Sequence, residues 1–250
     1  MDTFQKHFGD IRSRLAEPAT PVTFFRVCKA LALMWEEDSE RVNAEVVPYL
    51  DAHRHHWPDG MRVHPAFWEK LWLGDERVRF GPLCLISRLD LSYRKLGALA
   101  VERIANAPGL ETLDALDLRS NDLDDAMLEA LASTESLAAL SELDMGDNPL
   151  VNPSGLLGMK NLRVLKLMHT EVDDTFLEAL AERDALQLEE LWLTRTKITL
   201  GGLRTLVTAR DLGRLRRLDI TGVEGDLDLE FEVEAEISER WPDLDLTRGR

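Results

Sequence analysis

The sequence predicts an α/β fold: a solenoid in which a curved parallel sheet is backed by outer helices and closed at one end by an N-terminal α-helical cap. The first observation behind this prediction is a Leu-x-Leu stem, with Leu-x-Met and Leu-x-Ile variants, that returns seven times in 250 residues. Successive stems are 27, 27, 22, 26, 27 and 26 residues apart, and such a period indicates stacked copies of one unit. The second observation is that residues 1–80 lack the period and carry helix signals instead. The stems begin at Leu89, Leu116, Leu143, Leu165, Leu191, Leu218 and Leu244.

The second copy shows what one unit contains. Leu116 and Leu118 are two residues apart, so they share one face of a short strand. Asn121 follows where the chain must turn, and its amide can bond turn backbone that would otherwise be buried without a partner. Leu123 then re-enters the core, and Asp124-Asp125 fits the start of a helix, where carboxylates cap free amides. Each unit is therefore predicted to run from strand to turn to helix.

An outer helix is predicted in four copies, because the residue eight positions after the turn hydrophobe is apolar in each. The third copy has only 22 residues, and its Asn152-Pro153-Ser154-Gly155 stretch predicts a tight turn or a single 3₁₀ turn instead. Acidic pairs recur at the helix start, as in Asp173-Asp174, and Gly201-Gly202 at this place in the fifth copy is interpreted as a turn signal. The apolar pairs are Leu96 and Ile104, Leu123 and Leu131, Val172 and Leu180, and Ile198 and Leu206.

The pattern Leu-x-x-Leu-x-Leu-x-x-Asn-x-Leu resembles that of the leucine-rich repeat family over about residues 83 to 250. The repeat length and the helical outer segment are similar to the ribonuclease-inhibitor-like branch of the family. The stretch from Trp57 to Trp68 is similar to segments ahead of such repeats in some bacterial proteins. Thr can make part of the backbone bonding of the turn Asn, so only the first and sixth copies are expected to be imperfect. The turn position is occupied by Arg94, Asn121, Asn148, Thr170, Thr196 and Val223.

Residues 1–80 are predicted to form a helical N-terminal cap that covers the apolar end of the first repeat. Thr20-Pro21 is a helix start signal, and Pro48 is expected to kink the third helix or end it early. Pro58-Asp59-Gly60 is predicted to be a turn. The expected helices are Phe4 to Leu15, Val22 to Trp35, Asp38 or Ser39 to about His55, and Pro65 to Leu73.

Residues 81–250 are predicted to form the solenoid itself, with about seven repeats including a C-terminal capping repeat. Glu232 to Trp241 is the expected last helix, and Leu244 to Leu246 the final edge strand. Aspartates beside this strand, and the basic residues after it, would discourage edge-to-edge pairing.

The charge of the chain is uneven. The net charge is -16, and residues 81–250 carry 19 Lys and Arg against 33 Asp and Glu. Such a surface repels phosphate backbones, which argues against nucleic acid as a partner. Two explanations of the acidity stay open: it keeps the solenoid soluble, or it steers a basic partner toward the protein. The chain has two cysteines, no secretory-signal profile at its start and no apolar run of membrane-spanning length. These features predict a soluble, cytoplasmic protein with no membrane partner. We also expect the protein to be a monomer.

The histidines give the only dense group of potential metal ligands. His53 and His56 are three residues apart and could share a helical face, but no His-Glu-x-x-His motif or nearby cysteine pair accompanies them. No nucleophile elbow, phosphate-binding loop or dinucleotide motif occurs. We expect no enzyme activity, no cofactor and no metal. The alternative is an enzyme or metal-binding activity in residues 1–80, with the repeats as recruiter.

The residues between the inward-pointing leucines should face solvent along the inner wall of the solenoid. Its central column is expected to read Asp90, Asp117, Asp144, Lys166, Trp192 and Asp219. An outward Trp has no reason to exist in the core, and exposed Trp and Arg among charges are typical of interface hot spots. Three neighbouring aspartates would repel one another unless Arg88 and Arg119 or a basic ligand relieved them.

The sequence therefore predicts a non-catalytic protein-protein interaction module that binds a protein or peptide, possibly basic, on its concave sheet. A structural homo-oligomer in which Trp192 packs against a second copy is a further alternative. The predicted partner-binding residues are Trp192, Lys166, Met168, Val164, Asp90, Asp117, Asp144, Arg119, Glu190, Arg195 and His169.

Overall fold

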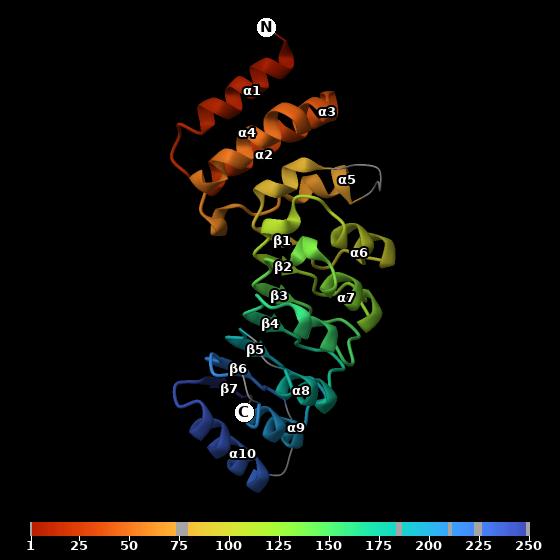
Figure 1. The fold of residues 1–250 in the computed structure, drawn as a ribbon, viewed down its shortest axis with the longest axis vertical. Helices are drawn as coiled ribbons and strands as arrows, with labels where there is room; N and C mark the ends of the chain where they lie inside the picture. Colours follow the sequence, from red (N-terminus) through yellow and green to blue (C-terminus); the bar gives the residue numbers. More distant parts are fainter. Residues whose placement is uncertain (1, 74–79, 184–186, 210–211, 223–226, 249–250) are drawn as a thin grey trace.

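The computed structural model describes residues 2–73, 80–183, 187–209, 212–222 and 227–248. Within these residues, one sheet contains seven strands that follow one another in chain order, each parallel to its neighbours (Figure 1). The predicted α/β solenoid with an N-terminal helical region is confirmed. The strands are β1 (Arg88–Asp90), β2 (Ala115–Asp117), β3 (Glu142–Asp144), β4 (Val164–Lys166), β5 (Glu190–Trp192), β6 (Arg217–Asp219) and β7 (Asp245–Thr247).

The first leucine of each stem lies opposite its counterpart on the next strand. This column runs from Leu89 on β1 to Leu218 on β6, and each of its side chains is at most 2% exposed. The last copy departs from the prediction, because Leu246 and not Leu244 pairs with Leu218. The preceding helix α10 (Leu227–Arg240) has 14 residues, against eight in α9, and this longer connection delays the final strand.

Four outer helices of eight residues each alternate with the strands, in the copies where they were predicted (Figure 1). The short third copy has a 3₁₀ turn at Ser154–Gly158 instead, as predicted. Asp124 accepts a hydrogen bond from the Met127 N–H and Asp173 from the Thr175 N–H, so the predicted helix-start role of the acidic pairs is confirmed. The helices are α6 (Ala98–Ala105), α7 (Asp125–Ala132), α8 (Asp174–Ala181) and α9 (Leu200–Val207).

The interpretation of Gly201-Gly202 as a turn signal was wrong. Thr199 is the N-terminal cap of α9, so both glycines lie inside its first turn. A Cβ added to Gly202 would lie 2.2 Å from Oδ1 of Asp174, which itself accepts the Thr199 N–H. Gly202 is therefore required because α8 approaches α9 closely at this point.

The turn asparagines form a ladder of buried hydrogen bonds. The amide of Asn148 donates to the backbone oxygens of Leu118, Met145 and Gly146, and its Oδ1 accepts the N–H groups of Asn121 and Leu123. Asn121 makes the equivalent bonds one repeat earlier.

The turn threonines reproduce part of this bonding, as predicted. Thr170 donates to the Leu167 oxygen and Thr196 to the Leu193 oxygen. The predicted turn position Val223 lies outside the described residues.

The N-terminal region is helical, as predicted. Thr20 caps α2 through a reciprocal pair of hydrogen bonds with Thr23. Pro48 does not end the third helix. A π-helical turn at Val42–Val46 precedes it, and Pro48 falls in the first turn of α4, where its missing N–H is tolerated. The predicted turn at residues 58–60 is realised as the 3₁₀ turn Asp59–Met61. The helices are α1 (Thr3–Arg14), α2 (Pro21–Glu37), α3 (Ser39–Arg41), α4 (Val47–His53) and α5 (Glu69–Trp72).

The core of the helical region continues into the core of the repeats. The Phe80 ring lies 4.7 Å from the ring of Trp35 and 5.0 Å from that of Trp68, and all three side chains are buried. At the other end, α10 packs on α9, and the Trp241 indole donates to the Leu212 oxygen. No described helix is both long and apolar enough to span a bilayer.

Candidate functional site: the inner face of the sheet

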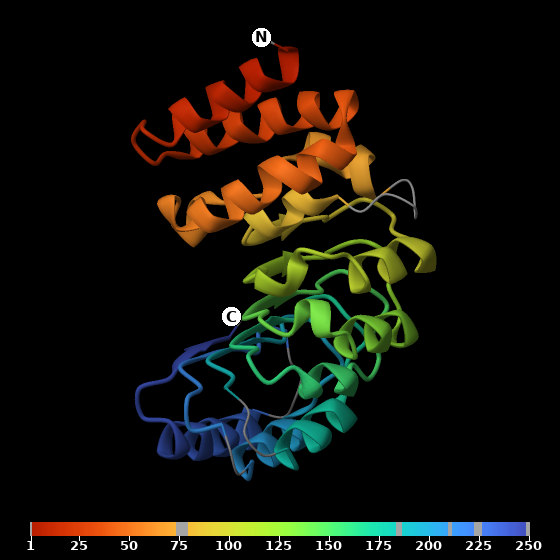
Figure 2. The same ribbon diagram turned by 45° about the horizontal axis from the view of Figure 1, so that its top comes forward.

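Within the described residues, no helix lies over the face of the sheet that carries the predicted binding residues. Helices α6 to α9 all lie on the other side of the strands (Figures 1 and 2). Leu191 is fully buried between Glu190 and Trp192, which are both half-buried, so the alternation predicted from the stem holds at β5. Trp192 therefore stands outside the hydrophobic core and on the open face.

Two charged residues hold the Trp192 side chain in place. Its indole N–H donates to Oε2 of Glu190 at 3.3 Å. The guanidinium carbon of Arg217, on the next strand, lies 4.2 Å from the centroid of the ring, which is the geometry of a cation–π contact. Lys166 and Asp219 occupy the positions across from Trp192 on β4 and β6. The Trp192 ring is thus partly buried and held in a defined position.

A second group of charges surrounds Glu142 on β3. Nζ of Lys166 lies 2.6 Å from Oε1 of Glu142, and Nη2 of Arg88 lies 3.0 Å from Oε2. Desolvation alone would raise the pKa of Glu142, but the Lys166 and Arg88 contacts outweigh it and lower the pKa. Lys166 was predicted as a partner-binding residue, and its ammonium is already committed to an ion pair on the same face.

The aspartates that end four of the strands have a structural role that the sequence analysis missed. Each carboxylate accepts the backbone N–H of the residue two positions later, which closes a local turn. The distances are 2.9 Å for Asp90 with Ser92, 3.1 Å for Asp117 with Arg119, 3.1 Å for Asp144 with Gly146 and 3.0 Å for Asp219 with Thr221. The recurrence of Asp at one position of the repeat was the available signal for this role.

Arg119 relieves the repulsion between two of these aspartates. Its guanidinium bonds to Asp117 at 2.8 Å and lies 3.4 Å from Asp144. Asp144 is only 7% exposed, and this burial raises its pKa from 3.8 to about 6. Arg88 does not share this task as predicted, because its guanidinium pairs with Glu142.

The structure divides the predicted residues into two neighbouring groups. Asp90, Asp117, Arg119, Asp144 and Lys166 line a cavity of about 360 Å³ over β1 to β4, together with Val63 from the N-terminal region. Val164, Glu190 and Trp192 lie beyond it on β4 and β5, and Met168 follows at the end of β4. The residues that line the cavity are mostly polar, and most of their charges form ion pairs on this face. The residues around Trp192 offer apolar surface instead.

His169 and Arg195, predicted at the loop edge, occupy one repeated turn position. Their φ angles are 57° and 53°, in the left-handed region, and both side chains are exposed. Tyr93 occupies the same position in the first repeat and is 64% exposed, which the sequence analysis did not single out. The equivalent residues are Tyr93, Ser120, Asp147, His169, Arg195 and Gly222.

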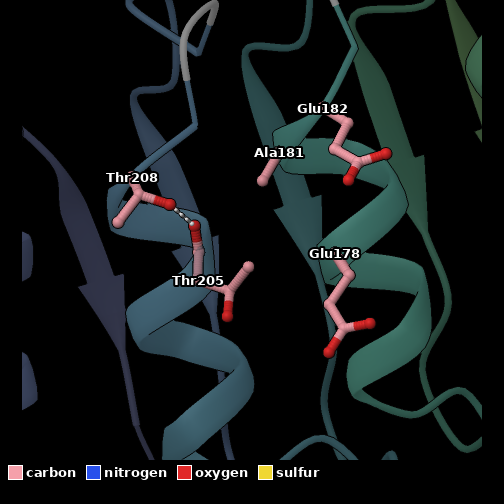
Figure 3. Close-up of a pocket in the computed structure, with 5 residues that line it drawn as sticks. All are labelled: Glu178, Ala181, Glu182, Thr205 and Thr208. Atoms are coloured by element: carbon pink, nitrogen blue, oxygen red, sulfur yellow. Dashed lines mark hydrogen bonds between the residues drawn. The ribbon is translucent and has the colours of Figure 1, made fainter.

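A further cavity of about 480 Å³ lies between α8 and α9, on the helical side of the solenoid (Figure 3). Glu178, Ala181, Glu182, Thr205 and Thr208 line it. Thr208 donates its hydroxyl to the Thr205 backbone oxygen at 2.7 Å. The lining pairs no hydroxyl with a general base, so the geometry gives no nucleophilic site there.

Three histidines of the N-terminal region form hydrogen bonds within the protein. A ring nitrogen of His53 lies 2.7 Å from the Tyr49 oxygen, and one of His56 lies 3.2 Å from the Glu17 oxygen. Nε2 of the buried His64 accepts the Trp72 indole N–H, and burial lowers the His64 pKa to about 4. In the part of the chain that the structure describes, no group of three or more His, Cys, Asp or Glu is placed to hold a metal ion.

Comparisons with known proteins bear on the fold alone. No protein-family model and no curated protein matches the chain. Among solved structures, internalin C2 of Listeria monocytogenes is 25% identical over 66% of this chain and 62% of its own, with a TM-score of 0.41. The chain in the TLR13–ssRNA13 complex is 18% identical over 66% of this chain and 26% of its own, with a TM-score of 0.42. Internalin InlF of the same bacterium is 16% identical over 66% of this chain and 61% of its own, with a TM-score of 0.37. The match therefore spans less than two thirds of each of these chains.

The strand register and the turn ladder decide the architecture. This chain has a leucine-rich repeat fold. Its leucine-rich repeats run from β1 to β7 and present one open face, on which Trp192 and the Glu142 and Asp144 charge groups lie side by side.

Proposed function

We propose that this leucine-rich repeat protein is a non-catalytic binding module that holds a protein or peptide partner on the open face of its sheet. The observation that carries the proposal is the environment of Trp192. Its ring is half-buried on a face that no described helix covers, and it stacks with Arg217. Its cross-strand neighbour on β4 is Lys166, which has the apolar residues Val164 and Met168 two positions before and after it. Trp and Arg side chains of this kind dominate the energetics of protein interfaces.

The partner we propose has an apolar group that packs on Trp192 and basic groups around it. The excess of acid in residues 81–250 would steer such a partner electrostatically, and it disfavours nucleic acid. Because most charges of the β1–β4 cavity are already paired, the apolar contact supplies most of the affinity and the charges supply orientation. The bound state contains one copy of this chain.

Two finer assignments belong to the same proposal. The eight-residue outer helices of four repeats support the ribonuclease-inhibitor-like branch of leucine-rich repeats. Cys28 and Cys84 are both free thiols, which supports a reducing compartment such as the cytoplasm.

Replacing Trp192 with Ala tests the proposal. Wild type and variant are used for affinity capture from the native lysate, and the captured partner is then titrated by calorimetry. We expect Trp192→Ala to weaken binding by about 2 kcal/mol or more, because it removes the aromatic anchor. The matched control is Phe231→Ala, which removes an aromatic ring that is 65% exposed on the outer helix α10. Equal affinities of wild type and Trp192→Ala for the captured protein would contradict the proposal.

A further inference from the structure

The second helix carries an apolar face that the described structure leaves largely exposed. Of the eight large hydrophobic side chains that are exposed among the described residues, three lie on α2. They are Val22, Phe25 and Leu33, which are 59%, 50% and 49% exposed. Their spacing of three and eight residues puts them on one side of the helix. A segment that served only to cap the repeats would bury such residues or replace them with polar ones.

This face forms one wall of a groove. Phe67, from the 3₁₀ turn Ala66–Trp68, packs edge-on against Phe25 with 5.5 Å between the ring centroids. Phe25, Ala32, Leu33 and Phe67 are the apolar lining, and the volume is about 400 Å³. Cavities of about 300–1,000 Å³ hold drug-sized ligands, so this one can take two or three apolar side chains.

The charged residues of the groove give it a sign opposite to that of the chain. Lys29 lines the groove and forms no ion pair in the described structure. Lys70, which is 72% exposed, lies 3.8 Å from Glu36. Because both side chains are exposed, this ion pair contributes little to stability. Arg26, 55% exposed, is one helical turn away from Val22 and loosely pairs with Glu17 at 4.0 Å. The lining therefore carries two cations and one anion, in a protein with a net charge of -16.

We infer that this groove, formed by α2 with Phe67 and Lys70, is a second docking site that receives a short amphipathic helix of a partner protein, with carboxylates flanking its apolar face. Apolar anchors at i, i+3 or i+4 and i+7 fill the groove, as helices do in apolar grooves generally. The flanking carboxylates meet Lys29 and Lys70. The net charge of the chain acts weakly at this range, because exposed charges are screened beyond about 8 Å at physiological ionic strength.

The shape and charge of the site favour a helix over two other occupants. Proteins that bind a membrane surface insert a protruding apolar face into it. These side chains instead line a hollow that also contains the acidic residue Glu36. A second copy that paired through the same groove would bring Lys29 and Lys70 against their own counterparts, and this local repulsion between like charges opposes self-association.

Fluorescence anisotropy with designed peptides tests the inference. The probes are three 16-residue labelled helices that carry Leu, Phe or Trp at the central anchor and Glu at the flanking positions. A matched set carries Lys instead of Glu. We expect at least one acidic probe to bind the full-length protein at micromolar to sub-millimolar concentration, and its Lys counterpart to bind at least tenfold more weakly. Absence of binding by all three acidic probes at about 1 mM, or equal affinities of the acidic and basic sets, overturns the inference.

Two exposed-site variants separate the apolar and the charged contributions. Leu33→Glu should abolish probe binding, and Lys29→Glu with Lys70→Glu should reverse the preference between the acidic and basic probes. Thermal melts followed by circular dichroism check that both variants remain folded. Leu99→Glu is the control, because Leu99 is 53% exposed on α6, away from the groove.

Three other results would overturn the inference: retention of affinity in Leu33→Glu, self-association in light scattering that Leu33→Glu abolishes, or binding to vesicles of anionic lipid without binding to any peptide. The site is independent of Trp192, so a failure here leaves the binding proposed for the inner face intact, and the Trp192→Ala variant should bind the acidic probe normally.

Discussion

Single polar side chains close the turns of this protein and shape the electrostatics of its inner face. The strand-end aspartates accept backbone N–H groups, and their surroundings push their pKa values in opposite directions. Asp144 is buried, and desolvation raises its pKa to about 6. At the exposed Asp90, desolvation also raises the pKa, but the Ser92 hydrogen bonds outweigh it and the net shift is downward. One position of the repeat thus holds two chemically different carboxyl groups.

Asp144→Asn should change how stability depends on pH. Between about pH 4 and 6 the native state binds more protons at Asp144 than the unfolded chain does, so its contribution to the free energy of unfolding falls as pH rises. The difference between wild type and variant should therefore shift by about 1–3 kcal/mol against wild type across this window. Urea unfolding at pH 4, 5, 6 and 7 measures it. His64 titrates in both proteins, so its opposite effect cancels in the difference.

Asp90→Asn is the matched control at the equivalent position. Because the Asp90 pKa is lowered, its contribution should be present above its ordinary value of 3.8 and should be lost as pH falls through its folded pKa. A difference between wild type and Asp144→Asn that stays constant from pH 4 to 6 would show that burial does not raise the Asp144 pKa.

At the scale of single elements, neighbouring repeats constrain one another's outer helices. Asp174 at the start of α8 accepts hydrogen bonds from the N–H and hydroxyl of Thr199, ahead of α9. Asp125 at the start of α7 bonds in the same way to the Val151 and Asn152 N–H groups of the next turn. The sequence identified these acids as helix-start residues, but their contact with the following repeat depends on the stacking.

Substituting the two glycines of α9 separates helix propensity from packing. Gly201→Ala should be neutral or stabilise by up to about 1 kcal/mol, because Ala is the better helix former and its Cβ would lie 3.3 Å from only the Thr199 hydroxyl. Gly202→Ala should destabilise by about 1–3 kcal/mol, because its Cβ would collide with the Asp174 carboxylate. Thermal and urea unfolding measure both. Equal effects of the two substitutions would mean that α8 and α9 do not approach as closely as described.

At the scale of the whole molecule, stability depends on continuity between the helical region and the repeats. Solenoid units contact mainly their neighbours, so each junction carries part of the cooperativity. Phe80 connects the buried rings of Trp35 and Trp68 to the first repeat. Val63 also bridges to Arg88, which extends the pairing of β1 toward the helical region.

Phe80→Ala should uncouple the two regions. Truncating a buried Phe lowers the free energy of unfolding by about 3–5 kcal/mol. At Phe80 this loss acts on the junction between the helical region and the repeats. Because four of the six Trp lie in residues 1–80, Trp fluorescence reports mainly on the helical region, whereas far-ultraviolet circular dichroism reports on the whole chain. We expect the two urea midpoints to coincide in wild type and to separate in the variant.

Phe176→Ala, a buried truncation in α8, is the control and should lower both midpoints together. Coincident midpoints in Phe80→Ala would argue against a junction at Phe80.

The sequence by itself determined the repeat, its buried leucine column, the helix starts and the outward position of Trp192. These features follow from periodicity, because most copies repeat the same local signal. It could not determine the partners of the charges. Whether Arg88 pairs with Glu142 or with an aspartate, and whether Lys166 is free, depends on distances between repeats.

Only the tertiary structure decided the register of the last strand, the need for Gly202 and the open groove along α2. The physical reason is the same in each case. The outcome depends on how closely separate segments approach in space, and the local pattern along the chain carries no information about that distance.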